Sequence, residues 1–222
     1  MVPCIIIPVL NRYDLLERAI KSIDYPVEEL LIIDNGGQST LNDYPWVIDR
    51  RHVKNYRVWS MPTNLGVAPS WNLGIKATPH APGWILMNSD AAFERGQLER
   101  FHNDTTEEAI IFTSATPGWS CVWIGASVVR KIGLFSECYV PAYFEDNDYE
   151  QRARNNGIPI LISDAAVKHD NSSTIKASPE LAEKNERSFQ ANQTLHLERW
   201  QNGTPPTGQW DLTRRRELGW DA

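Results

Sequence analysis

The chain has 222 residues, of which 41% are hydrophobic and 23% charged, a composition typical of a globular protein with a substantial core. Its net charge of −6 argues against stable nucleic-acid binding, because proteins that bind nucleic acid usually carry a basic face. The three cysteines are scattered without metal-ligand spacing, which favours a reducing compartment. No apolar run is long enough to span a membrane and no targeting segment is recognisable, so we expect a cytoplasmic protein.

The first half of the chain alternates apolar strands with helices. Runs rich in β-branched and apolar residues predict strands at Cys4–Leu10, Leu30–Asp34, Tyr56–Trp59 and Trp84–Asn88. Helical spacing of apolar residues predicts helices over Leu15–Ile23, with Asn11 as a cap, and over Val67–Ala77. This alternation predicts an α/β fold with a mostly parallel sheet that helices cover on both faces.

The second half is less regular. It predicts strands at Glu108–Ala115, Ser120–Ala126 and Ile158–Ser163, and helices at Ser127–Ile132, Phe144–Asn156 and Pro179–Trp200. The tail that follows is rich in turn residues and is expected to wrap the periphery. We therefore expect a main body over residues 1–178, with an amphipathic helix and tail at residues 179–222 as part of the same domain.

Polar residues follow three of the predicted parallel strands, at Pro8–Asn11, Asp34–Gly37 and Asn88–Asp90. Ligands bind at the carboxyl ends of strands in such sheets, so these stretches should converge on one edge. A carboxylate at Asp90 could hold Mg²⁺ or Mn²⁺, which need only one or two protein carboxylates when phosphates supply other ligands. The alternative is that Asp90 caps the following turn.

Three further stretches could carry chemistry. Backbone N–H groups of the glycine-containing segment Pro62–Lys76 could bind an anion, or the segment could be an ordinary turn. The acidic run Glu145–Glu150 could supply a general base, or its carboxylates could simply favour a helix N-terminus. His169 follows a predicted strand and turn, and could be a second metal ligand or a structural histidine.

Five motifs in this order resemble the family 2 glycosyltransferases, which have the GT-A fold. They are CIIIPVLNR, LLIIDNGG, NLGVAPSWNLGI, WILMNSDAAF and FSECYVPAYFEDNDYEQRARNNGIPI, and the resemblance covers about Val2 to Thr174. Family members move a sugar from a nucleotide-diphosphate sugar, often a UDP-sugar, to an acceptor hydroxyl. The resemblance therefore implies an inverting transferase that depends on Mn²⁺ or Mg²⁺.

The resemblance also assigns roles to positions of this chain. Asp146 would be the catalytic base, and Asp90 and His169 would hold the metal. Residues that would bind the nucleotide sugar are Pro8, Val9, Asn11, Asp34, Asn64, Gly66, Asn72, Asn88, Ser89 and Asp90. Asp34 would accept a hydrogen bond from the base, and Asn88–Asp90 would stand for the Asp-x-Asp metal motif of the family. Residues that would bind the acceptor are Trp119, Trp123, Tyr143 and Glu145.

The chain departs from the family pattern in two places. Asn88 replaces the first Asp of the metal motif, and a neutral amide weakens metal binding. The Gln-x-x-Arg-Trp motif of processive synthases is not matched, since His196–Trp200 retains only the final Arg-Trp, so we expect one sugar per event. Two alternatives stay open. One is a degenerate nucleotide-sugar binder without catalysis. The other is a sugar-phosphate nucleotidyltransferase, although Pro8–Asp14 lacks the glycine-rich loop of that class.

Overall fold

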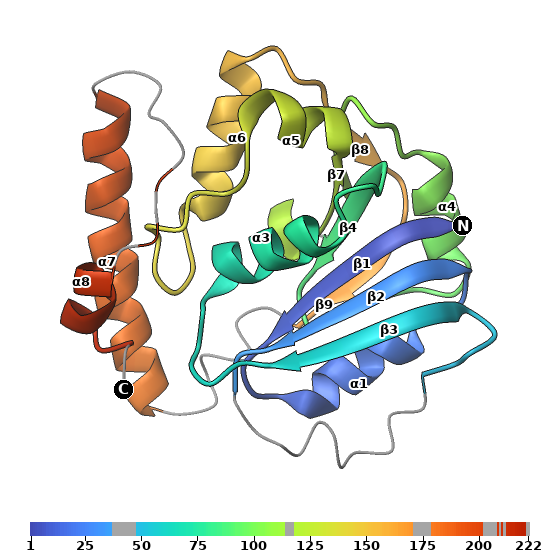
Figure 1. Ribbon diagram of the computed structural model, residues 1–222, viewed down its shortest axis with the longest axis horizontal. Coiled ribbons are helices and arrows are strands. Elements are labelled where there is room, and N and C mark those ends of the chain that lie inside the picture. The colour runs from blue at the N-terminus through green and yellow to red at the C-terminus, as the bar shows by residue number, and fades with distance from the viewer. Residues whose placement is uncertain are drawn as a thin grey trace.

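The computed structural model describes residues 1–36, 48–113, 118–170, 179–201 and 212–220, together with Gly208 and Trp210. Its centre is a seven-stranded sheet with the order β3-β2-β1-β4-β7-β6-β8 (Figure 1). The strands are β1 Val2–Val9, β2 Val27–Asp34, β3 Val53–Ser60, β4 Gly83–Met87, β6 Ile110–Thr113, β7 Cys121–Gly125 and β8 Ile160–Ser163. All neighbours pair in parallel except β7, which is antiparallel to both β4 and β6. The predicted α/β architecture is confirmed.

Helices cover both faces of this sheet. On one face, α1 (Tyr13–Lys21) and α4 (Gln97–Asn103) pack against strand residues such as Ile5 and Ile7. On the other face, α3 (Val67–Ala77), α5 (Ala126–Ile132) and α6 (Glu145–Asn155) pack against Ile6 and Leu31. Because successive strand residues point to opposite faces, the continuous apolar runs of β1 and β2 supply both cores at once.

A second, two-stranded sheet was not predicted. It pairs β5 (Ala91–Phe93) with β9 (Val167–His169) in antiparallel fashion, with Ala91 opposite His169. Strands of three residues carry too little pattern to be recognised in a sequence, because only the distant partner stabilises them. The pairing matters for function, because it places the residue before Ala91 beside His169.

Some predicted boundaries differ from the structure. Helix α3 has the predicted bounds, whereas α1 begins after Arg12, whose backbone is left-handed with φ 46°, and not after a cap at Asn11. Strand β3 is longer than expected and largely exposed along its middle, as suits the edge of a sheet. The short helix α4 lies where no helix was predicted.

The C-terminal part comprises α7 (Pro179–Gln201) and α8 (Leu212–Glu217). Both helices lie together on the side of the molecule to which the carboxyl ends of β1, β2 and β3 point (Figure 1). Much of the predicted peripheral tail lies outside the described residues, but Arg215 of α8 is fully buried and donates hydrogen bonds to the carbonyls of Asn64 and Leu65. None of the helices in the described residues is both long and apolar enough to cross a membrane.

Candidate active site

A cavity of about 340 Å³ opens at the carboxyl ends of the parallel strands. The ends of β1, β2 and β4 all contribute to it, through Pro8–Leu10, Asn35 and Asn88–Asp90. The predicted convergence of three polar strand ends is therefore confirmed. The size of this cavity is within the range typical of small-molecule sites.

One wall of the cavity carries a carboxylate and an imidazole. His169 Nε2 lies 3.1 Å from Asp90 Oδ1, and both side chains are about nine-tenths buried. The β5–β9 pairing produces this contact, and the Asp170 N–H and the Arg18 guanidinium both donate to the backbone carbonyl of Asp90. Across the described ranges, no group of three or more His, Cys, Asp or Glu side chains could hold a metal. Asp90 and His169 nevertheless form a donor pair of the kind that Mn²⁺ accepts when phosphate oxygens complete the coordination.

Two neighbouring acids at the start of α6 also line the cavity. Glu145 is 4% exposed, and its Oε2 has no hydrogen-bond partner among the described residues. Burial, and then the nearby Asp146, raise the pKa of Glu145 well above its ordinary value. Asp146 is half-buried, and burial also raises its pKa, although Asp146 Oδ1 accepts the Asn147 N–H at 2.8 Å. A carboxylate with a raised pKa in a cavity is a candidate general base.

The backbone that delivers these acids adopts an uncommon conformation. Tyr143 and Phe144 both have positive φ angles, of 74° and 72°, which non-glycine residues seldom adopt. The rings of both residues pack on Phe189 of α7, with centroid distances of 5.4 and 5.2 Å. Asn192, one turn further along α7, donates to the carbonyls of Val140 and Ala142. Helix α7 therefore holds the turn that precedes Glu145 and Asp146.

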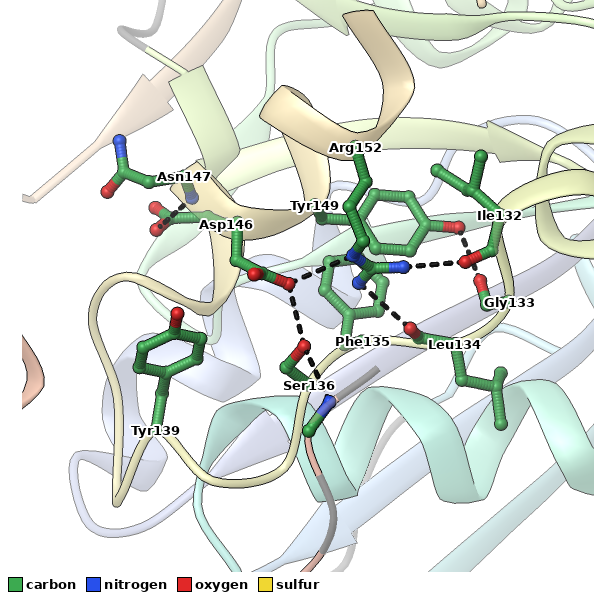
Figure 2. A network of polar contacts seen from close by, with 12 residues as sticks. Ile132, Gly133, Leu134, Phe135, Ser136, Tyr139, Asp146, Asn147, Tyr149 and Arg152 are labelled. Carbon is green, nitrogen blue, oxygen red and sulfur yellow. Dashed lines mark hydrogen bonds and ion pairs between the residues drawn. The ribbon is translucent and has the colours of Figure 1, made fainter. Parts of the chain in front are cut away.

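A buried ionic network connects helix α6 to the segment Ile132–Ser136 (Figure 2). Arg152 Nε donates to Asp148 Oδ2 at 2.9 Å, and Ser136 Oγ donates to the same oxygen at 2.7 Å. The remaining Arg152 donors reach the carbonyls of Ile132 and Leu134 (Figure 2). Two of the four acids in the run, Asp148 and Glu150, thus serve in ion pairs with Arg152 and Arg154, leaving Glu145 and Asp146 at the cavity.

Removal of this anchor is expected to cost much stability. An Arg152→Met variant leaves the Asp148 carboxylate buried without its cation, which costs about 3–5 kcal/mol of unfolding free energy. Arg154→Met is the matched control, because the same type of ion pair, to Glu150, lies on an exposed helix face and is worth less than about 1 kcal/mol. Urea denaturation of both variants measures the difference. If both variants lost the same unfolding free energy, the buried Asp148 carboxylate would not need Arg152 as its cation.

The segment before α3 does not present its N–H groups to an anion. The Leu65 N–H donates to Asn35 Oδ1, the Gly66 N–H to Asn64 Oδ1, and the Val67 N–H to the Pro141 carbonyl. Gly66 has φ 92°, and a Cβ there would lie 2.5 Å from the Pro141 oxygen. The glycine therefore permits close contact between two walls of the cavity, and the predicted anion-binding role of these N–H groups is not supported.

The structure brings most of the predicted site residues together. Those that line the cavity are Pro8, Val9, Asn64, Gly66, Asn88, Ser89, Asp90, Trp119, Tyr143, Glu145, Asp146 and His169. Four predicted residues lie outside this lining: Asn11, Asp34, Asn72 and Trp123. Asp34 is buried and accepts hydrogen bonds from Tyr13 Oη and the Gly36 N–H. Asn72 forms hydrogen bonds with the backbone of Phe135.

The acceptor-binding role predicted for Trp123 needs correction. Trp123 is 2% exposed and packs in the core on the α1 side of the sheet. Its indole Nε1 donates to the Thr106 carbonyl at 2.7 Å. The ring therefore serves as a core residue whose polar atom is satisfied, and it does not reach the cavity.

The model of glycosyl transferase family 2 matches residues 4–167, which is most of the chain. The chain belongs to glycosyl transferase family 2. No match is found among curated proteins.

Solved structures of other glycosyltransferases share the fold of this family 2 chain. A mannosyltransferase from Pyrobaculum calidifontis, in complex with GDP-Man and Mn²⁺, has a TM-score of 0.63 at 12% identity, covering 88% of this chain and 65% of its own. S. aureus TarS 1-349 in complex with UDP has a TM-score of 0.60 at 16% identity, covering 86% and 65%. The catalytic domain of Drosophila beta1,4galactosyltransferase 7 has a TM-score of 0.55 at 8% identity, covering 77% and 71%. The fold of this chain is therefore GT-A.

The chain spans only part of the length of these relatives. It covers 59% of a second structure of TarS 1-349.

Several residues of the family 2 chain line the cavity without a role having been assigned to them. Asn35 lies in the Asp34–Gly37 stretch that was expected at this edge of the sheet, although no binding role was given to it. Leu181 and Asn185 of α7, and Trp220 beyond α8, gave no local signal, because only tertiary packing brings them to the strand ends.

Proposed function

We propose that this chain is a metal-dependent, inverting glycosyltransferase that moves one sugar per event from a nucleotide-diphosphate sugar to an acceptor hydroxyl. The observation that carries the proposal is the arrangement of ionisable groups in one cavity. Asp90 and His169 lie on the strand side, while Glu145 and Asp146 lie at the start of α6. One pair suits a diphosphate with its cation, and the other suits a hydroxyl that must lose a proton.

Asp90 and His169 would hold Mn²⁺ or Mg²⁺. A bound cation would neutralise the charge that develops on the diphosphate leaving group. Asn88 would contribute a neutral amide oxygen at most, so the protein supplies a single carboxylate to the site. Mn²⁺ suits such a site better than Mg²⁺, because Mn²⁺ accepts an imidazole nitrogen as a ligand more readily. Mg²⁺ prefers oxygen ligands alone.

Asp146 would take the proton from the acceptor hydroxyl. Its raised pKa makes it a stronger base than an exposed aspartate, and its side chain lines the cavity at the start of α6. Trp119 and Tyr143 line the same cavity and would offer aromatic surface to a sugar or acceptor ring. Attack from the acceptor side, opposite the leaving diphosphate, inverts the anomeric carbon in one displacement.

We favour a UDP-sugar as donor, with other nucleotide sugars as the alternatives to be tested. Two lines support the donor class. The family match covers the donor-side motifs, and structures with the same fold are complexes with UDP, UDP-GlcNAc or GDP-Man. Asn64 and Gly66 would form the wall near the base and ribose, and Asp34 would accept a hydrogen bond from the base after a local opening beside Tyr13.

Thermal shift measurements test this function. The purified chain is heated with UDP, GDP, dTDP, CMP and their common sugar conjugates, each with and without Mn²⁺. A ligand at a hundredfold excess over its dissociation constant stabilises the folded state by about 2.7 kcal/mol. We expect a Mn²⁺-dependent rise in Tm with one nucleotide class. The absence of any shift across the panel would contradict the proposal.

A second candidate is a nucleotide-sugar binder without catalysis, which Asn88 in the metal motif favours. Both candidates predict nucleotide binding, so turnover separates them. Release of the free nucleotide from the best-binding sugar conjugate, measured with a coupled assay over a panel of acceptor sugars, supports the transferase. Tight binding without turnover on any acceptor supports the binder.

A further inference from the structure

Arg215 lies at the junction of the C-terminal segment and the cavity. Its side chain is fully buried. Its guanidinium donates to the carbonyls of Asn64 and Leu65 in the loop before α3, and to the carbonyl of Trp220. The same guanidinium stacks 4.3 Å above the ring centroid of Trp210. A single cation therefore joins the loop before α3 to the segment that follows α8.

Two of the residues that Arg215 contacts line the cavity. They are Asn64, in the loop before α3, and Trp220, which follows α8. Leu65 is held at both ends of its backbone, because its N–H donates to Asn35 Oδ1 while its carbonyl accepts from Arg215. Asn35 itself lines the cavity. The position of this wall thus depends on the side chain of Asn35, directly after β2, and on that of Arg215 in α8.

The indole of Trp220 is also fixed. Its Nε1 donates to Ser188 Oγ of α7 at 2.8 Å, and its backbone N–H donates to the Arg215 carbonyl at 2.9 Å. Ser188 Oγ in turn donates to the Lys184 carbonyl within α7. A buried aromatic ring with its polar atom satisfied offers a rigid apolar surface to a ligand.

The chemistry of arginine explains why this position needs a guanidinium. A buried charge is costly unless hydrogen bonds satisfy it, and charged hydrogen bonds to carbonyls are among the stronger ones in proteins. The planar fork can reach carbonyls of two separate segments at once, whereas a lysine ammonium is a point donor on a flexible stem. Removal of Arg215 would leave the Asn64 and Leu65 carbonyls without this donor, and the loop free to shift.

We infer that Arg215 is a positioning residue that makes the α8 segment a working part of the nucleotide-sugar site. It holds the Asn64–Gly66 wall and Trp220 in place against the nucleoside diphosphate portion of the donor. The identity of the ligand rests on the proposed function, whereas the coupling of Arg215 to the wall rests on the contacts alone. Arg215 contacts no reacting atom, and its effect passes through Asn64, Leu65 and Trp220.

The test compares Arg215→Lys, Arg215→Gln and the matched control Arg216→Gln, which removes the same charge from an exposed position of the same helix. Hydrogen exchange and titration calorimetry with UDP and Mn²⁺ are the two readouts. We expect the dissociation constant for UDP to rise about tenfold or more in both Arg215 variants, as loss of a charged hydrogen bond predicts. We expect faster exchange confined to the peptides that contain Asn64–Gly66 and Trp220. Arg216→Gln should change neither.

Each other outcome decides the inference. Unchanged UDP affinity and unchanged exchange in the Arg215 variants would overturn it, and so would fast exchange with unchanged affinity. A uniform rise in hydrogen exchange over the whole sheet would also overturn the inference, because it would show that Arg215 stabilises the entire fold and not this wall in particular. If the wild-type chain binds no UDP, the proposed donor is wrong, and exchange then decides alone: local acceleration near Asn64 supports the inference, and its absence refutes it. Arg215→Lys retains the charge, so the comparison survives if Arg215→Gln does not fold.

Discussion

An Asp146→Asn variant is expected to lose about 10²–10⁴-fold in kcat, the range that general-base catalysis supplies. Asparagine has nearly the same shape as aspartate, but its amide cannot take the proton from the acceptor hydroxyl. Dissociation constants for the nucleotide should stay at the wild-type value, because Asp146 lies on the side of the cavity opposite Asp90 in the proposed function. Steady-state kinetics and calorimetry with UDP measure the two quantities separately.

The control for this variant is Glu150→Gln on the same helix, which removes a carboxylate paired with Arg154 at the surface and should leave kcat unchanged. Retention of full activity by Asp146→Asn would contradict the base assignment. The neighbouring Glu145 would then be the next candidate, since it is more deeply buried and its Oε2 accepts no hydrogen bond from the described residues.

The pH profile provides a second check on the same residue. A general base works in its deprotonated form, so kcat/KM should fall as the pH is lowered through the pKa of Asp146. Burial raises that pKa above its ordinary value of 3.8, so the acid limb should lie at higher pH than an exposed aspartate would give. In Glu145→Gln this limb should persist, because the base is still present. Loss of the limb in Glu145→Gln would transfer the role to Glu145.

An Asp90→Ala variant is expected to lose Mn²⁺-dependent nucleotide binding, with a rise of about 10²–10³-fold in the dissociation constant for UDP in the presence of Mn²⁺. The estimate follows from the several kcal/mol that a cation contributes to binding and to stabilising phosphate charge, at 1.4 kcal/mol per tenfold. The variant leaves His169 as the sole ionisable member of the pair. Calorimetry with and without Mn²⁺ measures the loss.

Two further variants serve as a control and as a converse test of the Asp90→Ala result. Asp170→Asn is the matched control, since Asp170 is the neighbouring carboxylate but pairs with Arg18 at 2.5 Å and does not line the cavity. Asn88→Asp adds a second carboxylate to the motif and should tighten Mn²⁺ binding, because affinity for hard cations rises with the number of charged ligands. Unchanged UDP binding in Asp90→Ala would show that Asp90 serves only the local turn and its contact with His169.

The sequence predicts the strand ends that line the cavity well, and the contribution of the two C-terminal helices poorly. The strand ends at Pro8, Asn35 and Asn88–Asp90 follow long apolar runs, so their position is fixed by local pattern and by the rule that parallel strands deliver ligands at one edge. Trp220, Leu181 and Asn185 reach the cavity only through packing of α7 and α8. No local period encodes that packing, and a sequence alone cannot reveal it.

Trp123 illustrates a different limit. Strand β7 is apolar throughout and buried on both faces, so no alternation shows which face a given ring occupies. Both Trp119 and Trp123 were predicted to bind the acceptor, but Trp119 lies in a 3₁₀ helix at the cavity, whereas Trp123 lies in the core within β7. The role of an aromatic residue in such a strand depends on the register that the sheet adopts.

The β5–β9 pair has a consequence for how this chain can change over evolution. The distance between Asp90 and His169 depends on the backbone pairing of Ala91 with His169, and not on the length of chain that separates them. Insertions or deletions in loops between the two strands would therefore leave the pair intact. One residue added within Val167–His169 would turn the imidazole to the opposite face of the ribbon, since side chains alternate along a strand. The site is thus tolerant of large changes in loop length and intolerant of a single change in register.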